Sequence, residues 1–209
     1  MELKNKYSKP EENYKYHLKG DGVWMPEEFA FKCYNTLPRL RWAFDKIVDS
    51  KAKSLLDVGG KDMYLSLTMA KEGLKVVGID PTREAVKEAR TRKEKFEQAT
   101  GVKLDAEFED VMIEDYVTDQ QFDIIALLDV LDRVIDPDIV MKKLKKLGKK
   151  VLISLPDYYQ RFGFDDKKRN LDRVRIYKED EIKKFLKKYG KIEDFIIADG
   201  EFLIEFTFN

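Results

Sequence analysis

The sequence predicts an α/β domain in which helices cover both faces of a mostly parallel sheet. From Ser54 onward, short apolar runs alternate with amphipathic helical stretches, which is the pattern of a parallel sheet buried on both sides. Near the end of the chain, two strand-like runs over 192–198 and 201–208 flank Asp199-Gly200, a strong signal for a two-residue hairpin. We therefore expect the sheet to close with an antiparallel hairpin.

The expected elements follow one another without a repeat. Each helix is bounded by a glycine, a proline or a polar capping residue, and each strand is a short apolar run. The strands before the hairpin are expected over residues 54–58, 75–80, 122–128 and 150–155. The helices are expected over residues 26–49, where Pro38 offers a break, and over 62–72, 82–100, 137–147 and 178–189.

Length and composition narrow the classes of protein. A chain of 209 residues fits one domain with an elaboration, and 43% hydrophobic residues can build a sizeable core. Forty basic residues balance forty acidic ones, which removes the global electrostatic argument for a nucleic-acid or anionic-membrane partner. With one cysteine and one histidine we expect no internal disulfide and no metal site. No apolar run approaches the roughly 20 residues of a membrane span, so we expect a cytoplasmic protein without a membrane partner.

Two glycines stand between the first expected strand and the helix that follows it. At Gly59 and Gly60 the backbone can turn tightly and a ligand can approach it closely. The second strand ends at Asp80, about 20 residues further on, where a carboxylate can accept both hydroxyls of an adenosine ribose. The combination favours a pocket for an adenosine-containing ligand. The alternative is a plain tight turn, with Asp80 capping the next helix.

Five segments in order resemble the motifs of the class I S-adenosylmethionine-dependent methyltransferases, over about residues 53–209. The segments are 55–66, 76–80, 108–111, 122–134 and 151–157. The family fold is a Rossmann-like three-layer sandwich closed by an antiparallel C-terminal hairpin. The resemblance implies that S-adenosylmethionine is the cofactor, with Asp80 on the ribose and Asp110 facing the adenine. The implied cofactor-binding residues are Asp57, Gly59, Gly60, Lys61, Asp80, Asp110, Val111 and Leu128.

Two residues depart from the family pattern. Met63 stands where the family usually carries a further glycine, so its side chain either crowds the methionine part of the cofactor or points into the core. Arg133 stands where many small-molecule methyltransferases carry histidine, which argues against histidine-based proton transfer. Asp129 and Asp157, at the carboxyl ends of neighbouring strands, are then the candidate catalytic bases. The alternative for each is an aspartate that caps a loop.

The resemblance implies methyl transfer to a small-molecule acceptor. Residues 127–130 read Leu-Leu-Asp-Val rather than Asn-Pro-Pro-aromatic, which disfavours amino methylation of nucleic-acid bases. The lysine block over 142–150 is interpreted as a solvated helix face, and RNA binding there is the disfavoured alternative. Two rival functions remain: a non-catalytic binding module, and a nicotinamide-dependent oxidoreductase. Against the oxidoreductase stand the missing G-x-G-x-x-G pattern and the closing hairpin.

Two further regions of the chain are expected to contribute to the pocket for the methyl acceptor. We expect residues 1–50 to form a helical extension or lid on a methyltransferase-like domain of residues 51–209, with aromatic side chains and Arg39 or Arg41 completing the acceptor pocket. The alternative is that these aromatics only cover the sheet. The long insertion over 157–175 is a second candidate lid. The predicted substrate-binding residues are Trp24, Arg133 and Tyr158.

Overall fold

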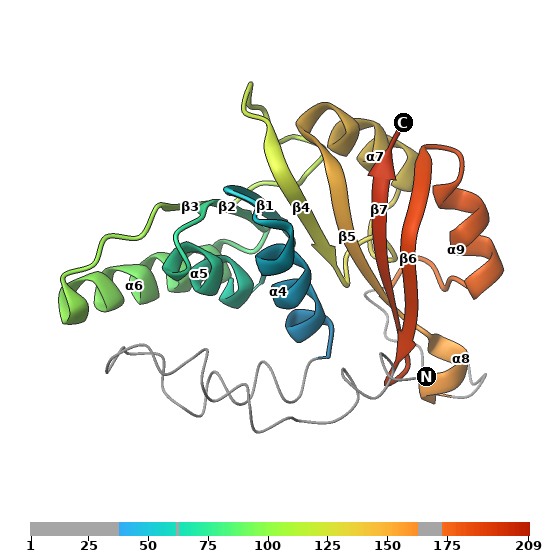
Figure 1. Cartoon of the computed structure of the whole chain (residues 1–209), viewed down its shortest axis with the longest axis horizontal. Coiled ribbons are helices and arrows are strands. Elements are labelled where there is room, and N and C mark those ends of the chain that lie inside the picture. Colours follow the sequence, from blue (N-terminus) through green and yellow to red (C-terminus); the bar gives the residue numbers. More distant parts are fainter. Residues whose placement is uncertain (1–37, 62, 163–172) are drawn as a thin grey trace.

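The computed structural model describes residues 38–61, 63–162 and 173–209, in which seven strands form one sheet of order β3-β2-β1-β4-β5-β7-β6 (Figure 1). Strand β7 runs antiparallel to its neighbours β5 and β6, and the other neighbouring pairs are parallel. The mostly parallel sheet with a closing hairpin is therefore confirmed. The strands are β1 (Ser54–Val58), β2 (Lys75–Ile79), β3 (Ala106–Glu109), β4 (Phe122–Leu128), β5 (Gly148–Pro156), β6 (Gly190–Ala198) and β7 (Glu201–Phe208).

Helices cover both faces of the sheet, which gives the three layers expected of the fold (Figure 1). One face packs against α4 (Pro38–Ser50), α5 (Tyr64–Lys71) and α6 (Arg83–Thr100), and the other against α7 (Pro137–Leu147) and α9 (Glu179–Leu186). A short helix α8 (Tyr158–Phe162) follows β5. Successive apolar side chains of β1, β2 and β4 point to opposite faces of the sheet, so each of these strands contributes to both cores.

Some boundaries differ from the sequence prediction for local reasons. Among the described residues α4 starts at Pro38, and proline suits the first turn of a helix, where no backbone N–H bond is needed. Helix α5 begins at Tyr64 because Met63 before it has a left-handed backbone, with φ 52°. The short strand β3 was not predicted, although its alternating burial is typical of a strand. Residues 26–37 of the expected first helix lie outside the described residues.

Helix α4 belongs to the same core as the sheet. Trp42 and Ala43 are fully buried, and Phe44 and Ile47 are nearly so, within the cluster that also holds β1 and β4 side chains. Lys46 Nζ extends from α4 to Asp194 Oδ2 on β6 and Glu205 Oε2 on β7, both at 2.8 Å. A lid formed by residues 1–50 stays a prediction, and these contacts tie its last thirteen residues to the sheet.

Candidate functional site

A cavity of about 640 Å³ opens at the carboxyl ends of the parallel strands. Its walls come from the loops after β1, β2, β3 and β4 and from the first turn of α4. The sheet order reverses between β1 and β4, so the loops after these strands diverge to opposite faces and leave a crevice, where open α/β sheets bind ligands. We call residues 57–61 and 79–82 the glycine-loop side of the cavity. Residues 129–135, between β4 and α7, are the β4–α7 wall.

The glycines of the first loop are required by close packing. Gly59 has a φ of 69°, and a Cβ there would lie 2.4 Å from Cγ2 of Val130. A Cβ on Gly60 would lie 2.5 Å from Sδ of Met63 and 2.9 Å from Oδ2 of Asp57. The side chains of Val130, Met63 and Asp57 thus occupy the positions that a Cβ would take, and the two glycines line the cavity with backbone alone.

Met63 lies in the core beneath this loop. Its side chain is fully buried, and Sδ lies 3.8 Å from Oγ of Ser66 and close to Gly60 and Gly78. Of the two alternatives that the sequence left open, the structure therefore favours packing over crowding of the cavity. Its left-handed backbone also explains why glycine suits this position in the resembling family.

Asp80 joins the ends of β1 and β2. Its Oδ2 accepts the N–H of Lys61 at 2.9 Å, and its Oδ1 accepts the N–H of Thr82 at 2.8 Å. The side chain is 6% exposed and lines the cavity. A carboxylate can accept about four hydrogen bonds, so about two acceptor sites remain for a ligand after these two bonds.

Asp57 is a second acid on the glycine-loop side. It is 3% exposed, and its Oδ2 accepts the Ser66 hydroxyl at 2.6 Å. Burial raises the pKa of Asp57 to about 6. The hydrogen bonds from Ser66 lower this pKa and only partly offset the effect of burial, and the charge of Asp80 raises it further. A cationic ligand group beside Asp57 would stabilise its ionised form.

The β4–α7 wall is dominated by ion pairs around Asp129. This residue has a φ of 62°, and its carboxylate pairs with Arg173 Nη1 at 2.8 Å and Arg133 Nη2 at 3.1 Å. Burial opposes ionisation, but the hydrogen bond and charge of Arg173, together with the charges of Arg39 and Arg133, lower the pKa of Asp129. A carboxylate held in this way is a weak proton acceptor, so the geometry favours a structural over a basic role for Asp129.

The other predicted site residues fall inside and outside the cavity. Seven of the eight predicted cofactor-binding residues line it, and Asp110 is the exception, being exposed and outside the lining. Arg133 and Arg39 also line the cavity, whereas Arg41 is 2% exposed in the core. Tyr158 is buried and outside the lining, and Trp24 lies outside the described residues. The ligand contacts of these residues stay predictions.

Asp157 caps a helix. Its Oδ1 accepts the N–H of Gln160 in α8 at 3.1 Å, and its own N–H donates to the carbonyl of Gly200 at 2.7 Å. It is not among the residues lining the cavity. The geometry favours the capping alternative, and a catalytic role for Asp157 has no structural support.

Residues that the sequence did not single out complete the cavity. Tyr64 and Met112 line it, and Ile135 forms part of its rim. Arg173 and Arg175 do not line the cavity, but their guanidinium groups bond to Asp129 and to the carbonyls of Val134 and Ile135 in the β4–α7 wall. No local pattern marks these residues, because each is a common residue type in a loop or helix and acquires its place only through folding.

Two classes of site receive no support from the described part of the chain. No group of three or more acidic, histidine or cysteine side chains gathers there as a metal site. None of its helices combines the length and apolarity needed to cross a membrane.

Comparison with known proteins identifies the family. The profile of the family described as "Methyltransferase domain" matches residues 49–201, which include the sheet through the hairpin turn and every loop that lines the cavity. The chain belongs to this family. The match supports the resemblance seen in the five motifs.

Curated relatives and solved structures agree with this assignment. The chain is 33% identical over 138 residues to a ubiquinone biosynthesis O-methyltransferase of Actinobacillus pleuropneumoniae, which covers 61% of this chain and 55% of that protein. The counterpart from Bordetella bronchiseptica is 32% identical over 130 residues, which cover 60% of this chain and 52% of that protein. The chain thus spans about half the length of the curated relatives it matches.

Solved structures show the same fold at low identity. Magnesium protoporphyrin IX methyltransferase from Synechocystis, crystallised with S-adenosylhomocysteine (SAH), has a TM-score of 0.67 at 15% identity, over 99% of this chain and 98% of that chain. An S-adenosylmethionine-dependent methyltransferase from Clostridium acetobutylicum has a TM-score of 0.63 at 16% identity, over 81% and 90% of the two chains.

Proposed function

We propose that this protein transfers a methyl group from S-adenosylmethionine to an oxygen atom of a small-molecule acceptor. The observation that carries the proposal is Asp80, a buried carboxylate on the cavity wall beside a glycine loop that leaves its backbone bare. Membership of the methyltransferase-domain family supports the reaction class. The small-molecule oxygen acceptor is supported by the relatives, which are named ubiquinone biosynthesis O-methyltransferases.

The residues of the glycine-loop side fit the cofactor chemically. Asp80 has acceptor capacity for the ribose hydroxyls, and Asp57 offers an acid to the cofactor's ammonium group. Gly59 and Gly60 line the cavity with backbone alone, which a ligand can approach closely. When bound, the cofactor supplies a sulfonium carbon that an acceptor lone pair can attack.

The protein's part in such a reaction is binding, alignment and exclusion of water. A methyl transfer breaks the methyl carbon–sulfur bond as the bond to the acceptor atom forms, so alignment of the two molecules supplies much of the rate. The β4–α7 wall and Arg39 face the remaining cavity and would orient the acceptor. A hydroxyl acceptor also loses its proton, which passes to water.

Calorimetric titration with S-adenosylmethionine, SAH and NAD tests the cofactor. We expect binding of the first two in the micromolar range, about −8 kcal/mol, and none of NAD. Asp80→Ala should weaken SAH binding by about 1.5–3 kcal/mol because the ribose loses a charged acceptor. NAD binding instead of SAH binding would favour the oxidoreductase.

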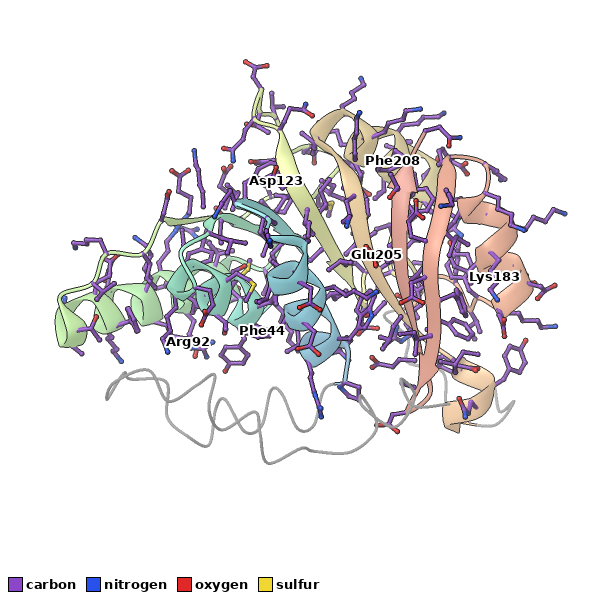
Figure 2. All side chains as sticks on the ribbon, viewed as in Figure 1. Phe44, Arg92, Asp123, Lys183, Glu205 and Phe208 are labelled. Atoms are coloured by element: carbon purple, nitrogen blue, oxygen red, sulfur yellow. The ribbon has the colours of Figure 1, made fainter. Side chains whose placement is uncertain are left out.

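Asp123→Ala is the matched control for the Asp80 variant. Asp123 also caps backbone, accepting the N–H of Lys53 at 2.8 Å and of Ser54 at 3.0 Å. Figure 2 shows it at the amino end of β4, at the opposite end of the sheet from the cavity. Its removal should lower stability and leave SAH affinity unchanged. Equal losses of affinity in both variants would reject the proposed site.

Three probe acceptors test the acceptor atom. Catechol, benzoate and aniline offer a hydroxyl, a carboxylate and an amine on the same aromatic ring, and SAH release measures transfer. We expect transfer to an oxygen probe and none to aniline. SAH binding without transfer to any probe would contradict the proposed acceptor class and favour the non-catalytic binding module.

A further inference from the structure

The β4–α7 wall needs support from outside itself. Five of its residues line the cavity: Asp129, Val130, Arg133, Val134 and Ile135. It is a loop that starts at Asp129 in the left-handed backbone conformation, which aspartate adopts more readily than most residues but still at some cost, so surrounding contacts help to fix it. Contacts from outside the wall supply part of that support.

Residues 173–175, which we call the arginine clamp, bond to three carbonyl groups of the wall. The N–H groups of Val174 and Arg175 both donate to the carbonyl of Asp132, at 2.9 and 3.0 Å. The Arg175 guanidinium donates from Nη1 to the carbonyl of Val134 and from Nη2 to that of Ile135, each at 2.7 Å. A planar guanidinium fork suits two neighbouring carbonyls, because its N–H donors have fixed directions.

Arg173 adds two ion pairs to the clamp. Its Nη1 contacts Asp129 Oδ1 at 2.8 Å and also pairs with Asp132 Oδ2. Its side chain is 9% exposed, and the side chain of Asp132 is 3% exposed. Solvent therefore screens the Arg173–Asp132 pair little, and the Arg173–Asp129 pair, whose carboxylate is 20% exposed, somewhat more. The start of the wall is thus fixed to the clamp by charge as well as by backbone bonds.

The clamp holds the wall without entering the cavity. Neither Arg173 nor Arg175 is among the lining residues, whereas Val134 and Ile135, whose carbonyls Arg175 holds, both are. Ile135 is 81% exposed although it is apolar and forms part of the cavity rim. Covering an apolar side chain at the mouth of a cavity removes it from water, so a ligand that covers Ile135 would bind more favourably. The direction of this side chain is set by the backbone that Arg175 holds.

We propose that Arg175, supported by Arg173, is a positioning residue that sets the β4–α7 wall for the acceptor. The proposal rests on the proposed function, because it assigns this wall to the acceptor and not to the cofactor. The glycine-loop side is held separately, by Asp80 and the bonds around it. Loss of the clamp should therefore change acceptor binding and leave cofactor binding intact.

The test compares Arg175→Gln with Arg175→Lys and with a control. Arg90→Gln removes a guanidinium that donates to the carbonyl of Phe108 in β3, away from the wall. We expect Arg175→Gln to raise the KM for the better oxygen probe about tenfold, with a smaller change in kcat and SAH affinity within about twofold. Arg175→Lys, which keeps the charge but not the fork, should be intermediate. Arg90→Gln should leave KM unchanged.

A second measurement does not depend on turnover. In protein with ¹³C-labelled isoleucine methyl groups, the Ile135 resonance, assigned with Ile135→Val, should shift in SAH-bound Arg175→Gln and not in Arg90→Gln. An unchanged Ile135 resonance, or an SAH affinity that falls by as large a factor as KM rises, would overturn the positioning role. If the wild-type protein methylates no probe, the proposed acceptor class fails while the resonance still decides the role of the clamp.

Discussion

The glycine-loop side and the β4–α7 wall are held by residues at different distances along the chain. On the glycine-loop side, Asp80 lies 19 residues from its partner Lys61, and Ser66 lies nine from Asp57. On the wall, the side-chain contacts from Arg173 and Arg175 come from residues 40 to 44 positions away. Bonds between neighbouring loops follow from the spacing of a sequence motif, whereas those from a distant loop depend on how the chain returns. The comparison predicts that the two sides respond differently to mutation.

The largest expected effect is on the wall. Arg173→Met leaves the buried carboxylate of Asp132 and the half-buried one of Asp129 without their shared cation, which should lower the free energy of unfolding by about 3–5 kcal/mol. Urea denaturation measures this loss. The control Lys183→Met removes a solvent-accessible pair with Glu179 and a cation–π contact with the Phe195 ring, and should cost about 1 kcal/mol. Similar small losses in both variants would show that the ion pairs of the wall contribute little.

The next effect tests packing on the glycine-loop side. Met63→Gly removes a fully buried side chain, which should lower the free energy of unfolding by about 2–5 kcal/mol. Glycine also adopts the left-handed backbone without strain, which should restore about 1–2 kcal/mol of that loss. We expect a lower melting temperature and no gain in SAH affinity. Met69→Ala, in the same core on α5, should lower stability without changing affinity. Tighter SAH binding by Met63→Gly would mean that this side chain crowds the cofactor.

The buried carboxyl group of Asp57, on the glycine-loop side, should make the free energy of unfolding depend on pH. The pKa of Asp57 is raised by burial from 3.8 to about 6, so its contribution to stability is full below about pH 4 and is lost as pH rises through 6. At pH 7 the ionised group should cost on the order of 3 kcal/mol. Asp57→Asn should therefore be more stable than wild type at pH 7 and equally stable near pH 4, by urea denaturation. A difference independent of pH would contradict this assignment.

The smallest expected effect is at Asp157, outside both sides of the cavity. Asp157→Ala removes the acceptor for the N–H of Gln160 and should cost about 1 kcal/mol of stability. SAH affinity and turnover of the oxygen probe should stay unchanged. A fall in kcat with a shifted pH profile would instead restore Asp157 as a catalytic base.

Several features could be predicted from the sequence because their causes are local. Alternation of apolar runs with helices predicts the parallel sheet, and Asp199-Gly200 predicts the hairpin that joins β6 to β7. The spacing from the glycines to Asp80 also predicts that they lie close together, because β1 and β2 are neighbouring parallel strands. The glycines follow the carboxyl end of β1, and Asp80 follows that of β2.

Other features required the tertiary structure. Met63 could have faced the cavity or the core, and only the packing under Gly60 and Gly78 decided between them. Asp129 and Asp157 both follow strands, and the sequence offered each as a base or a cap. The structure distinguishes them by the partners that reach them, which are Arg173 and Arg133 for one and the α8 backbone for the other.

The sequence by itself thus determined the layers, the closing hairpin and the cofactor-like side of the cavity, because period, turn chemistry and short spacing act within a few tens of residues. The tertiary structure alone decided which charged groups meet across the β4–α7 wall. Arginine and aspartate carry no marker of their partner along the chain. The pairing of Arg173 with Asp129 exists because β4 and β5 are neighbours in the sheet and residues 173–175 lie against the loop that follows β4.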